Sequence, residues 1–168
     1  MNDIIQLSDK TITLNRSEFL CKQGQTDTNI YFIESGSVKV SINSGEEEQI
    51  IRFGYRGNLV VALDSLLTGL ATQFDIQAIK KCKIKVISKK QLESYLNTEN
   101  NRLVWTEILE KLIVQQMERE VDLLTQSPLE RYQRVIQRSP QLFQEIPNKY
   151  IANYLRMSAE TLSRLKKY

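Results

Sequence analysis

The feature that most constrains the fold is a series of short strand patterns between residues 10 and 87. β-Branched and aromatic residues, which favour strands, concentrate in five segments, at 11–14, 29–33, 37–42, 48–53 and 83–87. In the third segment, apolar Val38 and Val40 alternate with polar Ser37 and Lys39, which is the period of a half-buried strand. Gly, Ser and Asn residues typical of turns separate the segments. Regularly spaced short strands predict a sandwich, a barrel or a jelly roll.

Two helical patterns follow the strands. Ser88 and Gln91 have the spacing of a capping box, which predicts a short helix that ends at Leu96. From Arg102 to Leu124, apolar residues recur at three- and four-residue steps, at Trp105, Leu109, Leu112, Ile113, Met117, Val121 and Leu124. Such a helix would span about 35 Å at its usual rise per residue. It either packs only on its own chain or, because the stripe is longer than one small roll can cover, pairs with a second copy as a dimer seam.

A hinge and a further helix are predicted after residue 125. Ser127 can cap a helix that starts at Pro128, and Glu130 completes the box. The Ser139-Pro140 pair ends it. We expect Leu129, Tyr132, Val135 and Ile136 to face inward and Arg131, Arg134 and Arg138 to face outward.

Residues 146–168 have the pattern of two short helices joined by three residues, a helix-turn-helix. Ile151 and Leu155 are spaced for one face of the first helix, and Leu162 and Leu165 for one face of the second. Ser158 is a favourable N-cap for the second helix because its hydroxyl can accept from a free backbone N–H.

The outward face of the second helix carries groups that suit the edges of base pairs. Glu160 can accept from a cytosine amine, Arg164 can bond guanine twice, and Lys166 and Lys167 can reach phosphates. A solvated helical hairpin with no DNA partner is the alternative interpretation of the same pattern.

Charge is divided unevenly along the chain. Residues 126–168 carry eight Lys and Arg and three acids, a net charge of +5, and the first 125 residues carry 15 basic and 17 acidic groups. A nearly neutral body with a basic end suits a polyanionic partner, although an idle basic surface has the same composition.

Composition argues against several other functions. The chain has no histidine, the commonest general base and a frequent zinc ligand, and its two cysteines, Cys21 and Cys82, are far apart. It shows no nucleophile motif or Gly-rich phosphate loop, no apolar run long enough for a bilayer, and no secretory signal at residues 1–5. We therefore expect a cytoplasmic protein with reduced thiols and without catalytic residues, metal, other cofactor or membrane association.

Two stretches together resemble the Crp/Fnr superfamily of bacterial transcription regulators. The sequence Ser158-Ala159-Glu160-Thr161-Leu162-Ser163-Arg164 is similar to the recognition helix of that superfamily. Phe19-Leu20, Gly24, the Tyr31–Val40 segment and Gly57 resemble a cyclic-nucleotide-binding β-roll. The resemblance extends over nearly the whole chain.

The resemblance also shows where this chain departs from members that bind cyclic AMP. Their ribose-binding glutamate aligns with Ala62, and their phosphate-binding arginine and the small polar residue after it align with Thr72 and Gln73. Without that arginine, a buried phosphate loses a charge-assisted pair, so we expect no response to cyclic AMP. Asp64, Ser65, Thr72 and Gln73 either line a pocket for a different effector or are ordinary turn and strand-end residues.

In the DNA-binding half, the resemblance assigns individual roles. Glu160 and Arg164 match positions that contact base edges, and Lys149, Ser158 and Thr161 match positions that contact the DNA backbone. Arg156 occupies a turn position where the motif usually has glycine, and Ala159 replaces a residue that often contacts a base. The sequence ends at Tyr168, where many members continue into a β-hairpin wing, so the wing is expected to be absent.

Together these patterns predict an α+β chain in three parts. A cyclic-nucleotide-binding-type β-roll, or jelly roll, occupies residues 1–98, a dimerisation helix 99–125 and a helix-turn-helix domain 126–168. The expected function is a Crp/Fnr-type transcription regulator whose partners are double-stranded DNA, a second copy of the chain, RNA polymerase and an unidentified small-molecule effector. The alternative is a module of the same fold whose helical tail binds protein and not DNA.

Overall fold

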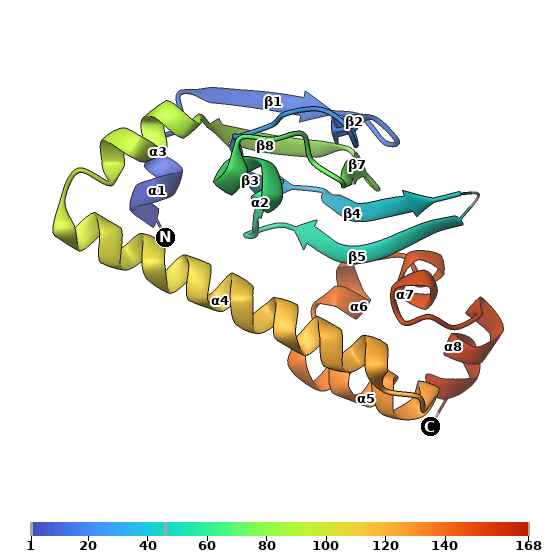
Figure 1. Ribbon diagram of the computed structural model, residues 1–168. Coiled ribbons are helices and arrows are strands. Elements are labelled where there is room, and N and C mark those ends of the chain that lie inside the picture. Colours follow the sequence, from blue (N-terminus) through green and yellow to red (C-terminus); the bar gives the residue numbers. More distant parts are fainter. Residues whose placement is uncertain (1, 46, 168) are drawn as a thin grey trace.

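The structure is a computed structural model that describes residues 2–45 and 47–167. Two four-stranded antiparallel sheets form the N-terminal roll, with strand orders β1-β8-β3-β6 and β2-β7-β4-β5 (Figure 1). The strands are β1 (Lys10–Leu14), β2 (Phe19–Cys21), β3 (Ile30–Ser35), β4 (Ser37–Ser44), β5 (Glu47–Tyr55), β6 (Leu59–Val61), β7 (Asp75–Ala78) and β8 (Cys82–Ile87). The five predicted strands are all present, and β2, β6 and β7 are additional short strands. The predicted jelly-roll class is therefore confirmed as an antiparallel β-roll.

The core of the roll lies between the two sheets. Ile33 and Ile84 from one sheet and Val38 and Ile76 from the other are fully buried in one cluster. At Gly36, between β3 and β4, φ is +86° and a Cβ atom would stand 2.3 Å from the Lys81 carbonyl oxygen. Only glycine fits such a close approach in a left-handed conformation, which is why the β3–β4 turn contains it.

The alternation of apolar and polar residues in β4 does not predict which of its side chains are buried. Val38 and Val40 face the core as the pattern predicts, but polar Ser37, Lys39 and Ser41 are buried as well. The Lys39 ammonium pairs with Glu48 and lies 5.4 Å from the centroid of the Tyr150 ring. Helices from the C-terminal end of the chain cover this outer face of the sheet, which a half-buried strand pattern does not foresee.

The helices are α1 (Asn2–Gln6), α2 (Leu63–Thr68), α3 (Lys89–Tyr95), α4 (Glu99–Leu124), α5 (Pro128–Arg138), α6 (Leu142–Glu145), α7 (Asn148–Tyr154) and α8 (Ala159–Leu165). The capping box at the start of α3 is present, with Ser88 and Gln91 each accepting the other's backbone N–H. Helix α4 begins three residues before the predicted Arg102 because the Thr98 hydroxyl caps it, accepting from the Asn101 N–H at 3.3 Å. None of the helices in the described residues is long and apolar enough to cross a membrane.

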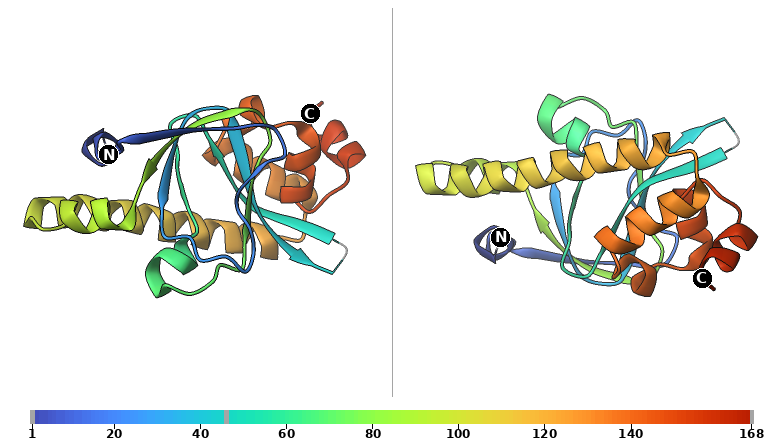
Figure 2. Two further views of the ribbon diagram at one scale, coloured as in Figure 1. Left: turned by 90° about the horizontal axis from the view of Figure 1, so that it is seen from above. Right: turned by 90° about the horizontal axis from the view of Figure 1, so that it is seen from below.

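Helix α4 runs along the roll, and α5 turns back beside it (Figures 1 and 2). The N-terminal half of α4 packs with α1, α3 and the roll through Val104, Trp105 and Ile108. Farther along, apolar side chains are exposed at Ile113, Val114, Met117, Val121 and Leu124, each by 46% to 82%. The predicted stripe is therefore split between a packed half and an uncovered half.

Helices α5 to α8 do not form a core of their own. Val135, Ile151, Leu155 and Leu162 are buried together with Ile50, Phe53 and Ile79 of the roll. The rings of Phe53 in β5 and Tyr154 in α7 lie 5.4 Å apart. The C-terminal helices are thus packed against the roll beside the β4–β5 hairpin (Figure 1).

Candidate functional site

Helices α7 and α8 pack through the residues that their spacing predicts. Ile151, Leu155 and Leu162 are fully buried, and Ala152 is 4% exposed where the chain folds back on itself. The backbone at Arg156 has a φ of +54°, the left-handed conformation that the turn requires. The Met157 N–H closes the turn by donating to the Ala152 carbonyl at 3.1 Å. Arginine therefore occupies the turn position that usually contains glycine.

Helix α8 is capped as predicted and exposes a polar face. The Ser158 hydroxyl oxygen accepts from the Thr161 N–H at 3.1 Å. Glu160, Arg164 and Lys167 are exposed, and within the described residues none of the three forms an ion pair. Hydrogen bonds from its own backbone and from Ser158 hold the pKa of Glu160 below its usual value. This carboxyl group is therefore ionised at neutral pH and free to accept a hydrogen bond.

Two other predicted contact residues lie at the edges of this surface. The Lys149 ammonium lies 4.7 Å from the centroid of the neighbouring Tyr150 ring. The Lys166 ammonium donates to the Asn148 Oδ1 atom at 2.6 Å and so links the end of α8 to the start of α7. Both side chains are exposed and add positive charge to α7 and to the end of α8.

One side chain that the sequence did not single out fixes α7 on the roll. The Asn153 carboxamide donates to the Glu48 carbonyl at 2.9 Å and accepts from the Ile50 N–H at 2.9 Å. An amide that bonds both groups of a strand in this way takes the place of a neighbouring strand. Beside it, Arg156 donates to the Gln49 Oε1 atom at 2.8 Å. These contacts use α7 and the turn, and they leave the outer face of α8 exposed.

The prediction for the two faces of α5 is wrong at two positions. Arg131, expected to face outward, is only 8% exposed, and Leu129, expected inward, is 42% exposed. The Arg131 guanidinium donates to the carbonyls of Leu155 at 2.9 Å and Arg156 at 3.1 Å, and also to Thr125 and Gln126. Two of these four carbonyl groups belong to the segment between α4 and α5, and two belong to the α7–α8 turn. The Arg131 side chain therefore joins the two segments.

Arg134 and Arg138 do not point freely into solvent either. Both pair with Glu118 and Asp122 of α4, and the Asp122 side chain is completely buried. Neither arginine is therefore available for a polyanion in this conformation. A helical period alone could not reveal this arrangement, because the two acids lie on a different helix.

The roll itself matches a known family. The cyclic nucleotide-binding domain matches residues 11–99, more than half of the chain. The chain belongs to the cyclic nucleotide-binding domain family. A search of curated proteins gives no significant match.

Solved structures share the fold over nearly the entire chain. FixK2 from Bradyrhizobium japonicum has a TM-score of 0.75 at 17% identity, covering 94% of this chain and 82% of FixK2. A CooA mutant from Carboxydothermus hydrogenoformans has a TM-score of 0.75 at 14% identity, covering 98% of this chain and 77% of CooA. TTHB099 from Thermus thermophilus, a transcriptional regulator of the CRP family, has a TM-score of 0.67 at 14% identity, covering 93% of this chain and 82% of TTHB099. The chain therefore shares its overall fold with these structures, one of which is a CRP-family transcriptional regulator.

Within this cyclic nucleotide-binding domain, the four residues considered for an effector pocket bond mainly to one another. The Asp64 carboxylate accepts from the Thr72 hydroxyl at 2.8 Å, the Gln73 N–H at 2.9 Å and the Ser65 N–H at 2.9 Å. The Ser65 hydroxyl oxygen accepts from the Asp27 N–H at 2.9 Å. This network of hydrogen bonds connects α2 to the segment that precedes β7. It favours the interpretation of the four residues as ordinary turn and strand-end residues.

The same network places a negative charge where the family resemblance locates the cyclic phosphate. Thr72 is 2% exposed and its hydroxyl group is already bonded to Asp64, while Ala62 is buried in the core of the roll. A phosphate at Thr72 would meet the Asp64 carboxylate, and threonine supplies no positive charge in place of an arginine, which disfavours its binding.

Proposed function

We propose that this protein is a sequence-specific, DNA-binding transcription regulator of the Crp/Fnr type that does not respond to cyclic AMP. The observation that carries the proposal is the outer face of α8, where Glu160, Arg164 and Lys167 are exposed and unpaired within the described residues, on a helix held rigidly from behind. A short helix with its apolar side fixed and its polar side free has the form needed to enter a major groove.

Each exposed group has a proposed role. Arg164 bonds a guanine through O6 and N7, and Glu160 orients Arg164 or accepts from a cytosine. Lys149, Ser158 and Thr161 contact the DNA backbone, and Lys166 and Lys167 neutralise phosphates. Base contacts determine sequence preference, whereas phosphate contacts raise affinity for every sequence.

The proposed division of the chain follows the same logic. Residues 1–98 form the effector-type roll, 99–125 the dimerisation helix and 126–168 the helix-turn-helix domain. The uncovered apolar side chains of α4, from Ile113 to Leu124, support a homodimer because exposed apolar groups along one helix are stabilised by pairing. A symmetric dimer presents two α8 helices, so the target should be a near-palindrome with half-sites about 34 Å, or one helical turn, apart. The setting is the cytoplasm, and two free, buried thiols at Cys21 and Cys82 are compatible with it.

Selection of binding sites from a random duplex library tests the proposal. The wild type should enrich a near-palindromic motif. Arg164→Ala should flatten preference at one base position per half-site, because a bidentate contact gives about 1–3 kcal/mol of discrimination. Lys167→Ala should keep the motif, weaken all sequences together and lower the salt slope by about one unit.

The two substitutions are matched controls for each other, since both remove one exposed cation from α8 or its end. An Arg164→Ala protein that selects the unchanged motif would show that α8 does not contact base edges.

The alternative, a protein-interaction module without DNA binding, has one observation in its favour. The C-terminal helices share their core with β5 and are held there by Asn153, so they could act as a fixed extension of the roll. Wild-type protein that enriches no sequence and shows no salt-dependent binding to duplex DNA would favour this alternative.

A further inference from the structure

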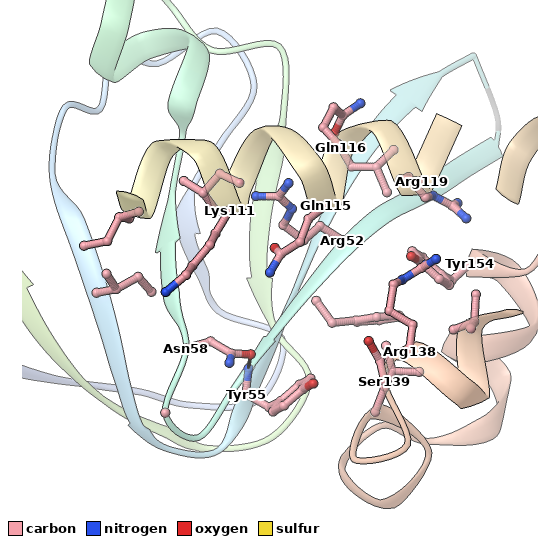
Figure 3. A pocket seen from close by; sticks show the side chains of 18 of the residues that line it. Arg52, Tyr55, Asn58, Lys111, Gln115, Gln116, Arg119, Arg138, Ser139 and Tyr154 are labelled. Carbon is pink, nitrogen blue, oxygen red and sulfur yellow. Dashed lines mark hydrogen bonds between the residues drawn. The ribbon is translucent and has the colours of Figure 1, made fainter. Parts of the chain in front are cut away.

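A pocket of about 460 Å³ lies between β5, the middle of α4 and α5. Its walls come from parts of the chain far apart in sequence, with Arg52, Tyr55 and Asn58 on the roll and Lys111, Gln115 and Arg119 on α4 (Figure 3). Tyr154 and Arg138 close the end nearest the C-terminal helices. Its volume is in the range of small-molecule sites. It is separate from the Asp64 network, none of whose residues lines it.

The lining of this pocket is strongly basic. Four basic side chains contribute to it, and among the described residues Glu107 is its one acidic side chain. Arg138 is already neutralised, because it pairs with Glu118 and Asp122. The remaining cations, Arg52, Lys111 and Arg119, form no ion pair within the described residues.

Arg119 is the most deeply buried of the three. It is 4% exposed, and only its Nη2 atom has an acceptor, the Ile50 carbonyl at 3.1 Å. Its Cζ atom lies 3.7 Å from the centroid of the Tyr154 ring, which stabilises the face of the guanidinium group but does not accept its in-plane N–H groups. The buried Nε and Nη1 atoms therefore have no partner in the described part of the chain.

The nearby acids do not compensate this charge. Asp122, one turn beyond Arg119 on α4, accepts from Arg134 and Arg138. Burial lowers the pKa of Arg119, and burial likewise lowers the pKa of Arg52 on the facing strand. Arg119 is thus held away from water, and Arg52 partly so, without an ion-pair partner among the described residues, which is costly unless an anion accompanies them.

We propose that this pocket, which Arg119 and Arg52 both line, binds a small oxyanion, a phosphate or a carboxylate. A guanidinium group with two free donors matches the two oxygens of such an anion. Gln115 and Asn58 supply amide groups at the rim, and the Lys111 side chain points from α4 towards Asn58 (Figure 3). Because the site is formed by both β5 and α4, the bound anion links the roll to the long helix. The proposal does not depend on DNA binding.

Calorimetric titration of the full chain with inorganic phosphate and, separately, with succinate tests the proposal, with sodium chloride at equal ionic strength as the reference. We expect saturable one-to-one binding of at least one probe, with a Kd below about 1 mM. The probe that binds distinguishes a phosphate site from a carboxylate site. Arg119→Gln and Arg52→Gln should each weaken binding at least about tenfold, because each removes a charge-assisted contact.

Arg16→Gln is the matched control, since Arg16 is an exposed arginine of the roll outside the pocket, and it should bind like the wild type. Circular dichroism melts establish that each variant is folded. If Arg119→Gln does not fold, the half-buried Arg52 gives the same test. No saturable binding of either probe up to about 20 mM, or unchanged binding in the folded arginine variants, overturns the proposal.

Discussion

Replacing Arg131 with methionine tests how the C-terminal helices are held. Methionine keeps most of the apolar stem but removes donors to the carbonyls of Thr125, Gln126, Leu155 and Arg156. A hydrogen bond from a charged group contributes about 1.5–3 kcal/mol. Four such bonds do not add, because burying the guanidinium group costs free energy and three of the four bonds are only partly buried. We expect Arg131→Met to lower the free energy of unfolding by about 3 kcal/mol, the lower part of the range for breaking a buried charged network.

Urea unfolding followed by circular dichroism at 222 nm measures this loss. With an m-value of about 2 kcal/mol/M, the midpoint should fall by about 1.5 M. Arg102→Met is the matched control, because within the described residues the side chain of this exposed arginine has one acceptor, the Leu96 carbonyl at 3.1 Å. Its loss should be below about 1 kcal/mol. Equal midpoints for the two variants would refute the conclusion that Arg131 holds the α7–α8 turn.

Three further predictions follow from the roll, the long helix and the thiols. Calorimetric titration should show no cyclic AMP or cyclic GMP binding at micromolar concentration, because Asp64 holds Thr72 where a phosphate would lie; a micromolar Kd would contradict this. The wild type should scatter light as a dimer and Met117→Glu with Val121→Glu as a folded monomer, since both side chains are exposed on one chain and a desolvated charge costs several kcal/mol in a seam; a monomeric wild type would exclude the seam. Burial raises the pKa of Cys21 to about 12 and also raises that of Cys82, so the native thiols should resist Ellman's reagent at pH 8. Above about pH 9 the unfolded chain releases these protons while the folded chain retains them, so the free energy of unfolding should fall as pH rises, and a flat profile from pH 8 to pH 10 would contradict the shift.

Elements whose residues follow a local rule were predictable from sequence. The capping box at Ser88, the cap at Ser158 and the burial of Ile151, Leu155 and Leu162 all depend on residues within a few positions of each other. Five strands of the roll were predictable for the same reason, because their β-branched residues and turns are contiguous, whereas the short strands β2, β6 and β7 were not predicted. The left-handed backbone at Arg156 also follows from local spacing, although the residue type disfavours it.

Tertiary structure alone decided which polar groups are buried. The sequence pattern placed Arg131 on the outside of α5, yet carbonyls of the preceding segment and of the distant α7–α8 turn converge on it. Likewise Lys39 is buried under α7, and Asn153 replaces a strand beside β5. Periodicity reports the side of an element on which apolar groups lie, but it does not report what a distant segment brings to the other side.

The pocket at Arg119 shows the same limit most clearly. Arg52, Arg119 and Tyr154 come from a strand and two helices, and no spacing in the sequence links them. Sequence determined the main strands, the long helix and the pair of short helices, because each of these elements depends on a pattern among near neighbours. Folding decided that two arginines line one pocket where no acid of the described residues pairs with them, because electrostatic and hydrogen-bonding partners are set by proximity in space.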